Sequence, residues 1–214
     1  MRHPIEEEAS AAGALAELGV SRETTDRLAC YVDLLRRWNN SVNLVAPSAL
    51  PRVWHRHILD SAQLWPLAPR PSRLWLDVGS GGGLPGLVCA LLARDFAPET
   101  RVALVESDRR KCAFLATCRR ELALDVDIHP ARVETLAPLG ADVISARAVA
   151  PLTTLFDQLA GQATPEATLL LPKGARHATE ISEARAHWRF TAELHPSITE
   201  PAARILRCHL QGRI

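Results

Sequence analysis

The chain has few of the features that mark secreted, metal-binding or membrane proteins. Its five cysteines are an odd number and include no CxxC pair, a pattern that favours neither a disulfide framework nor a zinc site. The longest apolar stretch, Leu84 to Ala93, has ten residues with a proline inside it, whereas a membrane helix needs about 20. We therefore expect no bound metal and no membrane span.

A secretory signal is also lacking. Glu6, Glu7 and Glu8 stand where a signal peptide would carry a basic start followed by an apolar core. Together with the cysteine pattern, this predicts a reducing, cytoplasmic location. The chain does have enough apolar residues for a core, since 47% of its 214 residues are hydrophobic and 23% are charged. This composition excludes a disordered or fibrous chain, and we expect a monomer.

Charge divides the first third of the chain. Residues 1–33 hold seven acidic residues against three arginines, whereas residues 36–70 hold five arginines against Asp60 alone. We expect helices at about Ala9–Leu18, at Arg22–Trp38 with Ser21 as N-cap, and at about Leu50–Trp65 before Pro66. Residues 1–70 are therefore predicted to form a helical segment, and residues 71–214 a second domain.

After residue 72, short apolar runs alternate with helical stretches. The predicted strands are Leu74–Val78, Val102–Glu106, Val126–His129, Asp142–Ser145, Thr168–Leu171, Trp188–Leu194 and Arg204–Leu210. The predicted helices between them are Gly86–Arg94, Arg109–Leu122, Leu152–Leu159 and Ala178–His187. This alternation indicates an α/β fold with a mostly parallel, doubly wound sheet. The last two strands have no helix between them and should form an antiparallel pair.

The most informative segment is a buried strand that runs into a glycine loop and then a helix. It reads Asp77-Val78-Gly79-Ser80-Gly81-Gly82-Gly83-Leu84-Pro85-Gly86. Glycines permit a tight turn and let a ligand approach the backbone closely. We therefore interpret this loop, including Asp77, Gly79, Ser80 and Gly81, as a cofactor site.

Two classes of ligand fit the loop. Gly81, Gly83 and Gly86 satisfy the GxGxxG pattern with Glu106 twenty residues further on, which leaves a nicotinamide-dependent oxidoreductase open. Asp77 favours a different ligand, because an acidic side chain there would repel a pyrophosphate but suits an ammonium group. S-adenosylmethionine carries an ammonium group and no phosphate. Glu106 would then accept hydrogen bonds from its ribose hydroxyls.

The loop resembles that of the bacterial small-subunit ribosomal RNA guanine-N7 methyltransferases, the RsmG (GidB) family. The resemblance extends over about residues 30–175, through Trp38-Asn39, Asn43-Leu44, His57-Ile58-Leu59-Asp60-Ser61, Ile144-Ser145-Ala146-Arg147-Ala148-Val149 and Lys173-Gly174. The His57–Ser61 stretch is far more specific than any glycine pattern. Glu106 departs from the family, in which many members have Asp.

The resemblance implies a Rossmann-like class I S-adenosylmethionine-dependent methyltransferase that acts on guanine N7 of 16S ribosomal RNA. The sheet would be seven-stranded and mostly parallel, with an antiparallel C-terminal strand, behind an N-terminal helical segment. By position, the resemblance assigns Gly79 and Leu84 to the cofactor loop and Val133 and Glu134 to the adenine pocket. It assigns Arg147 to the side of the site that faces the cofactor or the target base.

Guanine N7 has an in-plane lone pair and no proton, so its methylation needs no general base. Methyltransferases that act on adenine or cytosine amines lose support, because no (D/N/S)PP(Y/F/W) clamp follows the fourth predicted strand. Cytosine-C5 methyltransferases use a Pro-Cys nucleophile, and no cysteine of this chain follows a proline. Arg147 stands where such a clamp would be. It is the candidate catalytic residue, since its guanidinium could hold the cofactor carboxylate or guanine O6.

The candidate RNA-binding residues are mostly cations of the basic segment. They are Arg36, Arg37, Arg52, Arg56, His57 and, after the fifth predicted strand, Lys173. The four arginines have almost no acidic neighbours in the sequence. We expect Asp60 to bind an arginine rather than to do chemistry. An RNA-binding module without catalytic activity remains a third interpretation.

Overall fold

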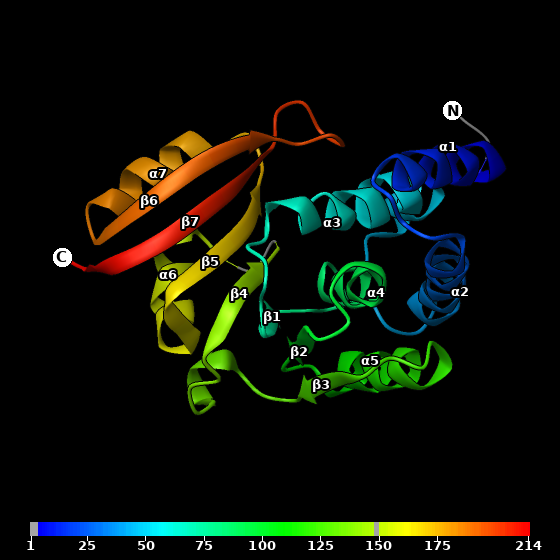
Figure 1. Ribbon diagram of the computed structural model, residues 1–214, viewed down its shortest axis with the longest axis horizontal. Coiled ribbons are helices and arrows are strands. Elements are labelled where there is room, and N and C mark those ends of the chain that lie inside the picture. Colours follow the sequence, from blue (N-terminus) through cyan, green and yellow to red (C-terminus); the bar gives the residue numbers. More distant parts are fainter. Residues whose placement is uncertain (1–3, 148–149) are drawn as a thin grey trace.

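The computed structural model describes residues 4–147 and 150–214 and holds a seven-stranded sheet flanked by helices (Figure 1). The strands are β1 (Leu74–Val78), β2 (Arg101–Val105), β3 (Val126–His129), β4 (Ala141–Ala146), β5 (Ala163–Lys173), β6 (Trp188–Pro196) and β7 (Arg204–Arg213). The α-helices are α1 (Pro4–Glu17), α2 (Arg22–Asn39), α3 (Asp60–Ala62), α4 (Gly86–Phe96), α5 (Arg109–Glu121), α6 (Leu152–Leu159) and α7 (His177–Arg185). Short helical turns are η1 (Pro47–Arg52), η2 (Trp54–Leu59), η3 (Trp65–Leu67), η4 (Val133–Thr135) and η5 (Ala160–Gln162).

The strands lie in the order β3-β2-β1-β4-β5-β7-β6. The first five are parallel, and β7 runs antiparallel to both β5 and β6. The predicted α/β fold, with a mostly parallel sheet and an antiparallel C-terminal pair, is confirmed. Strand β7 lies between β5 and β6, so the last strand of the chain is not at the edge of the sheet.

Side chains of successive strand residues point to opposite faces of the sheet and supply two hydrophobic cores. Trp75, for example, belongs to the core that also holds residues of α1, α2, α4 and α5. Its neighbour Leu76 belongs to the core beneath α6 and α7. The sheet therefore has a helical layer on each face (Figure 1).

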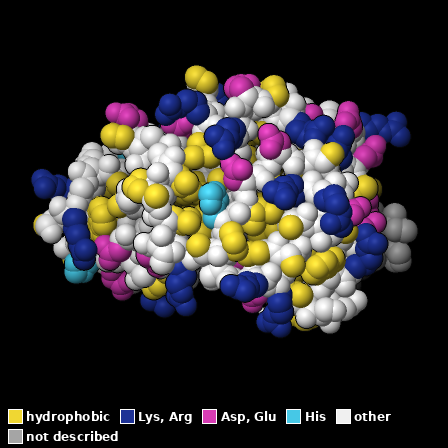
Figure 2. Space-filling view, turned by 90° about the horizontal axis from the view of Figure 1, so that it is seen from below, with side chains coloured by type: hydrophobic (Ala, Val, Ile, Leu, Met, Phe, Trp, Pro, Cys, Tyr) yellow, Lys and Arg dark blue, Asp and Glu magenta, His cyan; other side chains and the backbone are white. Residues whose placement is uncertain are grey.

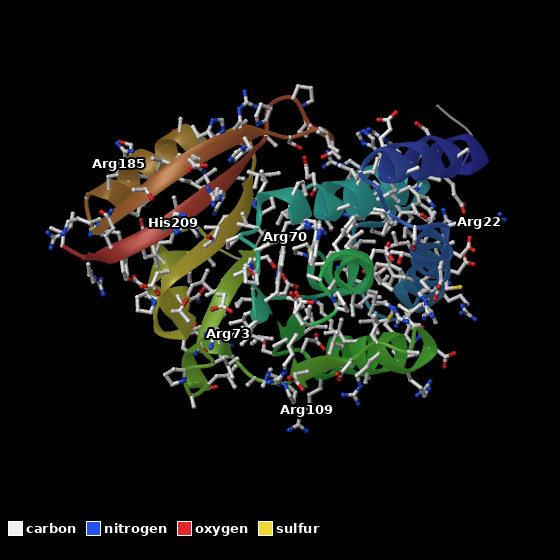
Figure 3. The ribbon with its side chains drawn as sticks, viewed as in Figure 1. Arg22, Arg70, Arg73, Arg109, Arg185 and His209 are labelled. Carbon is white, nitrogen blue, oxygen red and sulfur yellow. The ribbon has the colours of Figure 1, made fainter. Side chains whose placement is uncertain are left out.

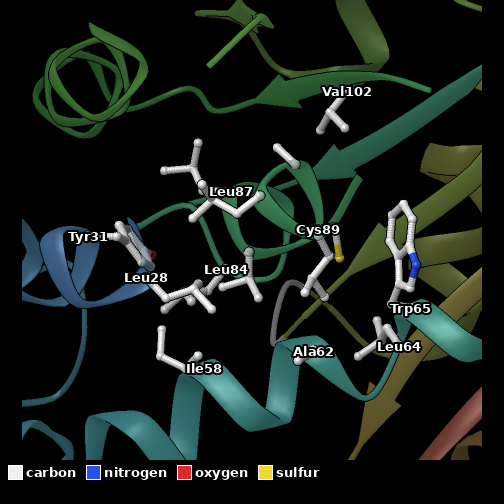
Figure 4. Close-up of a cluster of buried hydrophobic side chains, with 14 of the residues drawn as sticks. Leu28, Tyr31, Ile58, Ala62, Leu64, Trp65, Leu84, Leu87, Cys89 and Val102 are labelled. Atoms are coloured by element: carbon white, nitrogen blue, oxygen red, sulfur yellow. The ribbon is translucent and has the colours of Figure 1, made fainter. Parts of the chain in front are cut away.

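Helix α4 is buried on all sides, from Gly86 to Ala93. One side packs on the sheet, and the other meets the N-terminal helical residues. Figure 4 shows Leu28 and Ile58 of these residues beside Leu84, in the loop directly before α4. The predicted N-cap of α2 is confirmed, since the Ser21 side chain accepts a hydrogen bond from the amide of Thr24. The N-terminal residues thus supply the second partner that an entirely apolar helix needs.

The third predicted helix differs from a regular α-helix. In place of one helix over Leu50–Trp65, the chain forms the 3-10 turn η1, the π-helical turn η2 and the short α3. Pro51 lies inside η1 and has no amide hydrogen to donate, which disfavours α-helical hydrogen bonding there. The following π turn keeps Trp54 and Ile58 buried.

Candidate active site

The candidate site lies at the carboxyl ends of the central strands, where the strand order reverses direction. Val78, the last residue of β1, pairs with Val105 on one side and with Ala146 on the other. Gly79, Glu106 and Arg147 follow these three residues directly and so meet at one edge of the sheet. Crevices of this kind, at a topological switch point, are where open α/β sheets bind their ligands.

The glycine loop is fixed by backbone hydrogen bonds. The amides of Gly79 and Ser80 both donate to the Val105 carbonyl, at 2.9 and 3.1 Å. Gly81 and Gly83 have positive φ angles of 55° and 84°, which favour glycine. At Gly86, an added Cβ atom would lie 2.7 Å from the Cβ of Asp77, so only glycine allows α4 to begin so close to β1.

Asp77 is fully buried and holds the loop from inside the protein. Its carboxylate accepts hydrogen bonds from the Gly86 amide at 3.1 Å and from the Ser145 hydroxyl at 2.7 Å. The Ser145 oxygen in turn accepts from the Trp75 indole at 2.9 Å. Burial raises the pKa of Asp77 to about 6, with the hydrogen bonds opposing that shift. The carboxylate expected to face an ammonium group is thus directed into the core.

Trp75 and Ser145 were not among the predicted site residues. No spacing rule links them to Asp77, but Trp75 occupies β1 two residues before it, and Ser145 pairs with Asp77 in the sheet register. A polar residue in each of two neighbouring buried strands is the signal that could have identified Ser145 as a hydrogen-bond partner.

Glu106 lies at the end of β2 and is only 8% exposed. Its two carboxylate oxygens accept hydrogen bonds from the amides of Gly81, at 2.8 Å, and of Asp108, at 2.7 Å. A carboxylate offers about four lone-pair sites, so acceptor capacity remains for a ligand. Glu106 therefore orients the glycine loop and can still accept hydrogen bonds from a diol.

The η4 turn that follows β3 carries the two residues assigned to an adenine pocket. Val133 is buried and belongs to the hydrophobic core that also holds Val78 and Val105. Glu134 is exposed and accepts a hydrogen bond from the Gln158 side chain at 2.6 Å. The turn begins four residues after His129, whose carbonyl accepts a hydrogen bond from the Glu106 amide at 3.1 Å, and Val133 is its apolar residue.

Arg147 does not project freely from the end of β4. Its Nη1 lies 3.1 Å from a carboxylate oxygen of Asp60 and 3.2 Å from Nδ1 of His57. The side chains of Arg147 and Asp60 are each 18% exposed. Asp60 also accepts a hydrogen bond from the Thr199 hydroxyl at 2.6 Å. The expectation that Asp60 binds an arginine is confirmed.

This contact fixes the protonation of His57. A guanidinium can only donate, so Nδ1 of His57 must be the acceptor and Nε2 must carry the hydrogen. Burial, followed by the nearby Arg147, lowers the pKa of His57 to about 4, while Asp60 acts in the opposite direction. The imidazole is therefore neutral near pH 7. Its Nε2 is buried and has no hydrogen-bond partner among the described residues.

A cavity of about 680 Å³ adjoins this cluster and is lined by His57, Asp60, Arg147 and Lys173. Lys173 is largely buried, and its Nζ lies 2.8 Å from Glu180 and 2.9 Å from the Ala150 carbonyl oxygen. The charge expected to reach a phosphate is thus compensated within the protein. Ala148 and Val149, which belong to the motif containing Arg147, lie outside the described residues.

The arginines of the basic segment have more acidic partners than the sequence indicates. Arg56 lies 3.2 Å from Glu200 of the β6–β7 connection, and Arg36 lies 3.8 Å from Asp33 one turn earlier in α2. Arg37 donates to the Asp33 carbonyl at 3.4 Å. Arg52 is exposed and has no ion pair within residues 4–147 and 150–214. These arginines lie at the surface, unlike the buried Trp54 beside them.

Positive charge is spread over several elements. Figure 3 labels Arg22 at the start of α2, Arg70 and Arg73 before β1, and Arg109 at the start of α5. In Figure 2, Lys and Arg side chains on one face alternate with apolar and acidic ones and form no continuous patch. Charge density alone therefore does not delimit an RNA-binding surface on that face.

Neither a metal centre nor a membrane span emerges from the part of the chain that the structure describes. It contains no group of three or more His, Cys, Asp or Glu side chains suited to hold a metal ion. None of its helices is long and apolar enough to cross a membrane.

The chain is similar in sequence to methyltransferases along most of its length. The family model described as GidB, rRNA small subunit methyltransferase G, matches residues 24–206. A ribosomal RNA small subunit methyltransferase G of Cereibacter sphaeroides is 52% identical over 92% of this chain and 95% of its own length. One of Methylorubrum extorquens is 45% identical, covering 94% of this chain and 95% of its own length.

Solved structures share the fold at low sequence identity. The O-methyltransferase TomG from Streptomyces achromogenes, solved in complex with S-adenosylmethionine, has a TM-score of 0.59 at 14% identity and covers 99% of this chain and 100% of its own. A methyltransferase from Geobacter sulfurreducens has a TM-score of 0.58 at 16% identity, covering 94% of this chain and 96% of its own. Both likenesses support a Rossmann-like class I methyltransferase fold.

Proposed function

The chain belongs to the rRNA small subunit methyltransferase G family, and from this premise we propose that it transfers a methyl group from S-adenosylmethionine to N7 of a guanine in 16S ribosomal RNA. It is an S-adenosylmethionine-dependent methyltransferase. The oxidoreductase interpretation of the glycine pattern loses its support, because the relatives and the solved structures described above are methyltransferases. A purely RNA-binding role loses its support for the same reason.

The observation that carries the proposal is the glycine loop at the switch point with Glu106 beside it. The Glu106 carboxylate retains acceptor capacity for a ribose diol, and Gly81 through Gly83 leave backbone without side chains next to it. These features fit a nucleoside that carries no phosphate. The proposed cofactor-binding residues are Asp77, Gly79, Ser80, Gly81, Leu84, Glu106, Val133 and Glu134, and Arg147 would lie between the cofactor and the target base. Asp77 acts through the loop that it holds.

Catalysis here consists mainly of placement. When bound, the cofactor would supply an electrophilic methyl group on a sulfonium sulfur, with S-adenosylhomocysteine as the leaving group. Guanine N7 offers a lone pair that needs no deprotonation, so the residues of this chain would only have to position it. Proximity and alignment can contribute ~7–11 kcal/mol to such a step. The methylated guanine gains positive charge, so a free cation beside N7 would oppose the reaction. Arg147 is compensated by Asp60, and His57 is neutral, so the cluster avoids that repulsion.

We assign Arg147 and His57 to the target base as a pair. The Nε2–H of His57, held in this tautomer by Arg147, is buried without a partner and would have to become exposed to donate to guanine O6, while N7 stays free to react. Arg147 is then a positioning residue rather than a catalytic one. An adenine would present an amino group to the same donor, which provides a reason for choosing guanine.

We assign the RNA backbone to the surface cations. Arg36, Arg37, Arg52 and Arg56 would contact phosphates, which their position at the surface supports, whereas Lys173 would have to leave Glu180 to do so. The helical residues 1–70 and the domain 71–214 would form opposite walls of the RNA site. We further propose that the protein acts as a cytoplasmic monomer.

The test is to map the methyl group. Small ribosomal subunits and naked 16S RNA from cells lacking the gene are incubated with the protein and isotope-labelled S-adenosylmethionine. We expect the label at N7 of one guanosine. RNA taken from cells that lack the gene should carry no methyl group at that position before the incubation. Label at another atom, or none in either RNA, would refute the proposal. Calorimetry should show binding of S-adenosylhomocysteine and none of NADH.

A further inference from the structure

Helix α2 contacts the backbone of the glycine loop directly. Tyr31, the only tyrosine of the chain, is fully buried, and its hydroxyl donates a hydrogen bond to the Gly82 carbonyl. Figure 4 shows its ring on α2 beside Leu28, facing Leu84 and Leu87 at the start of α4. The contact joins residues 51 positions apart, from the N-terminal helices to the centre of the loop.

The hydrogen bond completes the fixation of one peptide group. In the planar peptide between Gly82 and Gly83, the carbonyl and the amide point in opposite directions. The Gly83 amide donates to the Ser80 carbonyl at 2.7 Å, and the Gly82 carbonyl accepts from Tyr31. Both ends of the peptide plane are therefore held, one by the loop itself and the other by α2.

Glycines would otherwise allow this plane to turn over. The plane turns about ψ of Gly82 and φ of Gly83; Gly83 has a φ angle of 84°, and glycine populates positive and negative φ about equally. Rotation of the peptide would redirect its dipole, and it would move the backbone that a cofactor approaches. The hydroxyl of Tyr31 is the side-chain group that opposes this rotation.

Packing brings α2 and the segment after it close enough for this role. A Cβ atom added at Gly82 would lie 3.3 Å from both Leu35 Cδ1 and Leu44 Cβ, so nothing larger than glycine fits without displacing them. Leu44 is held in turn by the side-chain oxygen of Asn39, which accepts from the Leu44 amide at 3.0 Å. The loop thus rests on residues outside the sheet domain.

We propose that Tyr31 is a positioning residue for the cofactor loop: its hydroxyl keeps the Gly82–Gly83 peptide in the orientation that binds S-adenosylmethionine. The inference rests on the proposed function, because it takes that cofactor as the ligand of the loop. Burial raises the pKa of Tyr31 well above its usual value, so the hydroxyl stays a donor throughout the physiological range. The N-terminal helices then contribute to cofactor binding without touching the cofactor.

The first test compares two variants that each lose one buried hydroxyl. Tyr31→Phe should weaken S-adenosylhomocysteine binding about 3- to 10-fold, the range for one neutral hydrogen bond. Thr100→Val is the control: its hydroxyl donates to the Ser72 carbonyl at 2.8 Å, next to the opposite end of β2. Its affinity should match the wild type. Equal affinity of Tyr31→Phe and wild type, or equal weakening in both variants, would overturn the inference.

The second test needs no substitution and covers the case in which Tyr31→Phe does not fold. Because the chain has one tyrosine, 3-fluorotyrosine gives a single ¹⁹F resonance from position 31. Adding S-adenosylhomocysteine should shift this resonance and slow exchange of the Gly83 amide. A resonance and exchange rate that do not respond to bound ligand would refute the role of Tyr31. If the wild type binds no S-adenosylhomocysteine, the proposed function itself fails.

Discussion

The contribution of the His57 imidazole to the stability of the folded protein depends on pH. Its pKa is lowered from 6.5 to about 4 in the folded protein, so below pH 6.5 the unfolded chain binds the proton more readily. The stability that His57 contributes is therefore complete above pH 6.5 and is lost as the pH falls towards 4. Asp77 has the opposite effect on the pH dependence of stability, since its pKa is raised to about 6. This effect is the same in the wild type and in a His57 variant, so it cancels when the two are compared.

We predict that His57→Gln flattens the pH dependence of stability. Between pH 7 and pH 4 the wild type should lose up to about 3 kcal/mol more unfolding free energy than the variant, because one pKa unit corresponds to ~1.4 kcal/mol. Urea unfolding at a series of pH values measures this difference. Parallel curves for the two proteins would mean that His57 titrates normally in the folded state.

We predict that Glu106→Ala weakens cofactor binding with little change in RNA affinity. The substitution removes the acceptor for the ribose diol and also the partner of the Gly81 amide. Hydrogen bonds to charged groups contribute ~1.5–3 kcal/mol, so affinity for S-adenosylhomocysteine should fall roughly 10- to 150-fold. Calorimetry is the measurement, with Glu121→Ala, an exposed partner of Arg120, as the control. An unchanged affinity would leave Glu106 with a purely structural role.

Among the elements, the η1–η2–α3 segment is the one that links the two parts of the site. It carries His57 and Asp60 to Arg147 at the end of β4, and Gln63 just after it accepts a hydrogen bond from the Ile198 amide at 2.9 Å. The β6–β7 connection is thereby held against the same cavity. A regular α-helix through these residues would place the side chains at different angles, since a π turn has a wider hydrogen-bonding ring.

The same segment presents Arg52 and Arg56 to solvent, and we predict that they bind RNA phosphates. Replacing both by alanine should weaken RNA binding and reduce the slope of log affinity against log salt concentration by about 0.7 for each phosphate that the variant no longer neutralises. Cofactor affinity should be retained. Filter binding at several salt concentrations measures the slope.

A matched control removes two exposed, ion-paired arginines elsewhere. Arg101 is the first residue of β2, and Arg120 lies in the last turn of α5. Both therefore lie towards the end of the sheet opposite the glycine loop. Alanine at both positions should leave the salt slope unchanged. If the two double variants behave alike, the RNA surface lies elsewhere. If the Arg52 and Arg56 double variant is less stable than the wild type and the control variant is not, the role of these two arginines is structural.

In the whole molecule, α4 makes the two parts of the chain depend on each other. It is buried from Gly86 to Ala93 and needs apolar partners on both sides. We predict that the fragment 71–214 aggregates or stays unfolded. The full chain should unfold in one cooperative transition, which circular dichroism and tryptophan fluorescence would both report at the same midpoint. A soluble fragment that binds S-adenosylhomocysteine with full affinity would contradict both this prediction and the role of Tyr31.

Local features of the sequence determined the elements and the family. Alternating apolar runs predicted β1, β3 and α6 with the boundaries that the structure has, because strand and helix periods are properties of neighbouring residues. The glycine loop identified the end of β1, and the motif around His57 identified the family. These signals lie within short stretches of chain, where sequence spacing and spatial distance correspond.

Only the tertiary structure decided which charges are available. Asp77 is directed inward to Ser145, Lys173 is paired with Glu180, and Arg147 is compensated by Asp60 from a segment 87 residues away. Whether an ionisable group faces a ligand or a partner depends on burial and on contacts between remote segments. Spacing does not predict these contacts, because they depend on how the elements pack. Pairing of β1 with β4 brings Ser145 to Asp77, packing of α7 beside β5 brings Glu180 to Lys173, and the segment after η2 brings Asp60 to Arg147. The contact of Tyr31 with Gly82 arises in the same way.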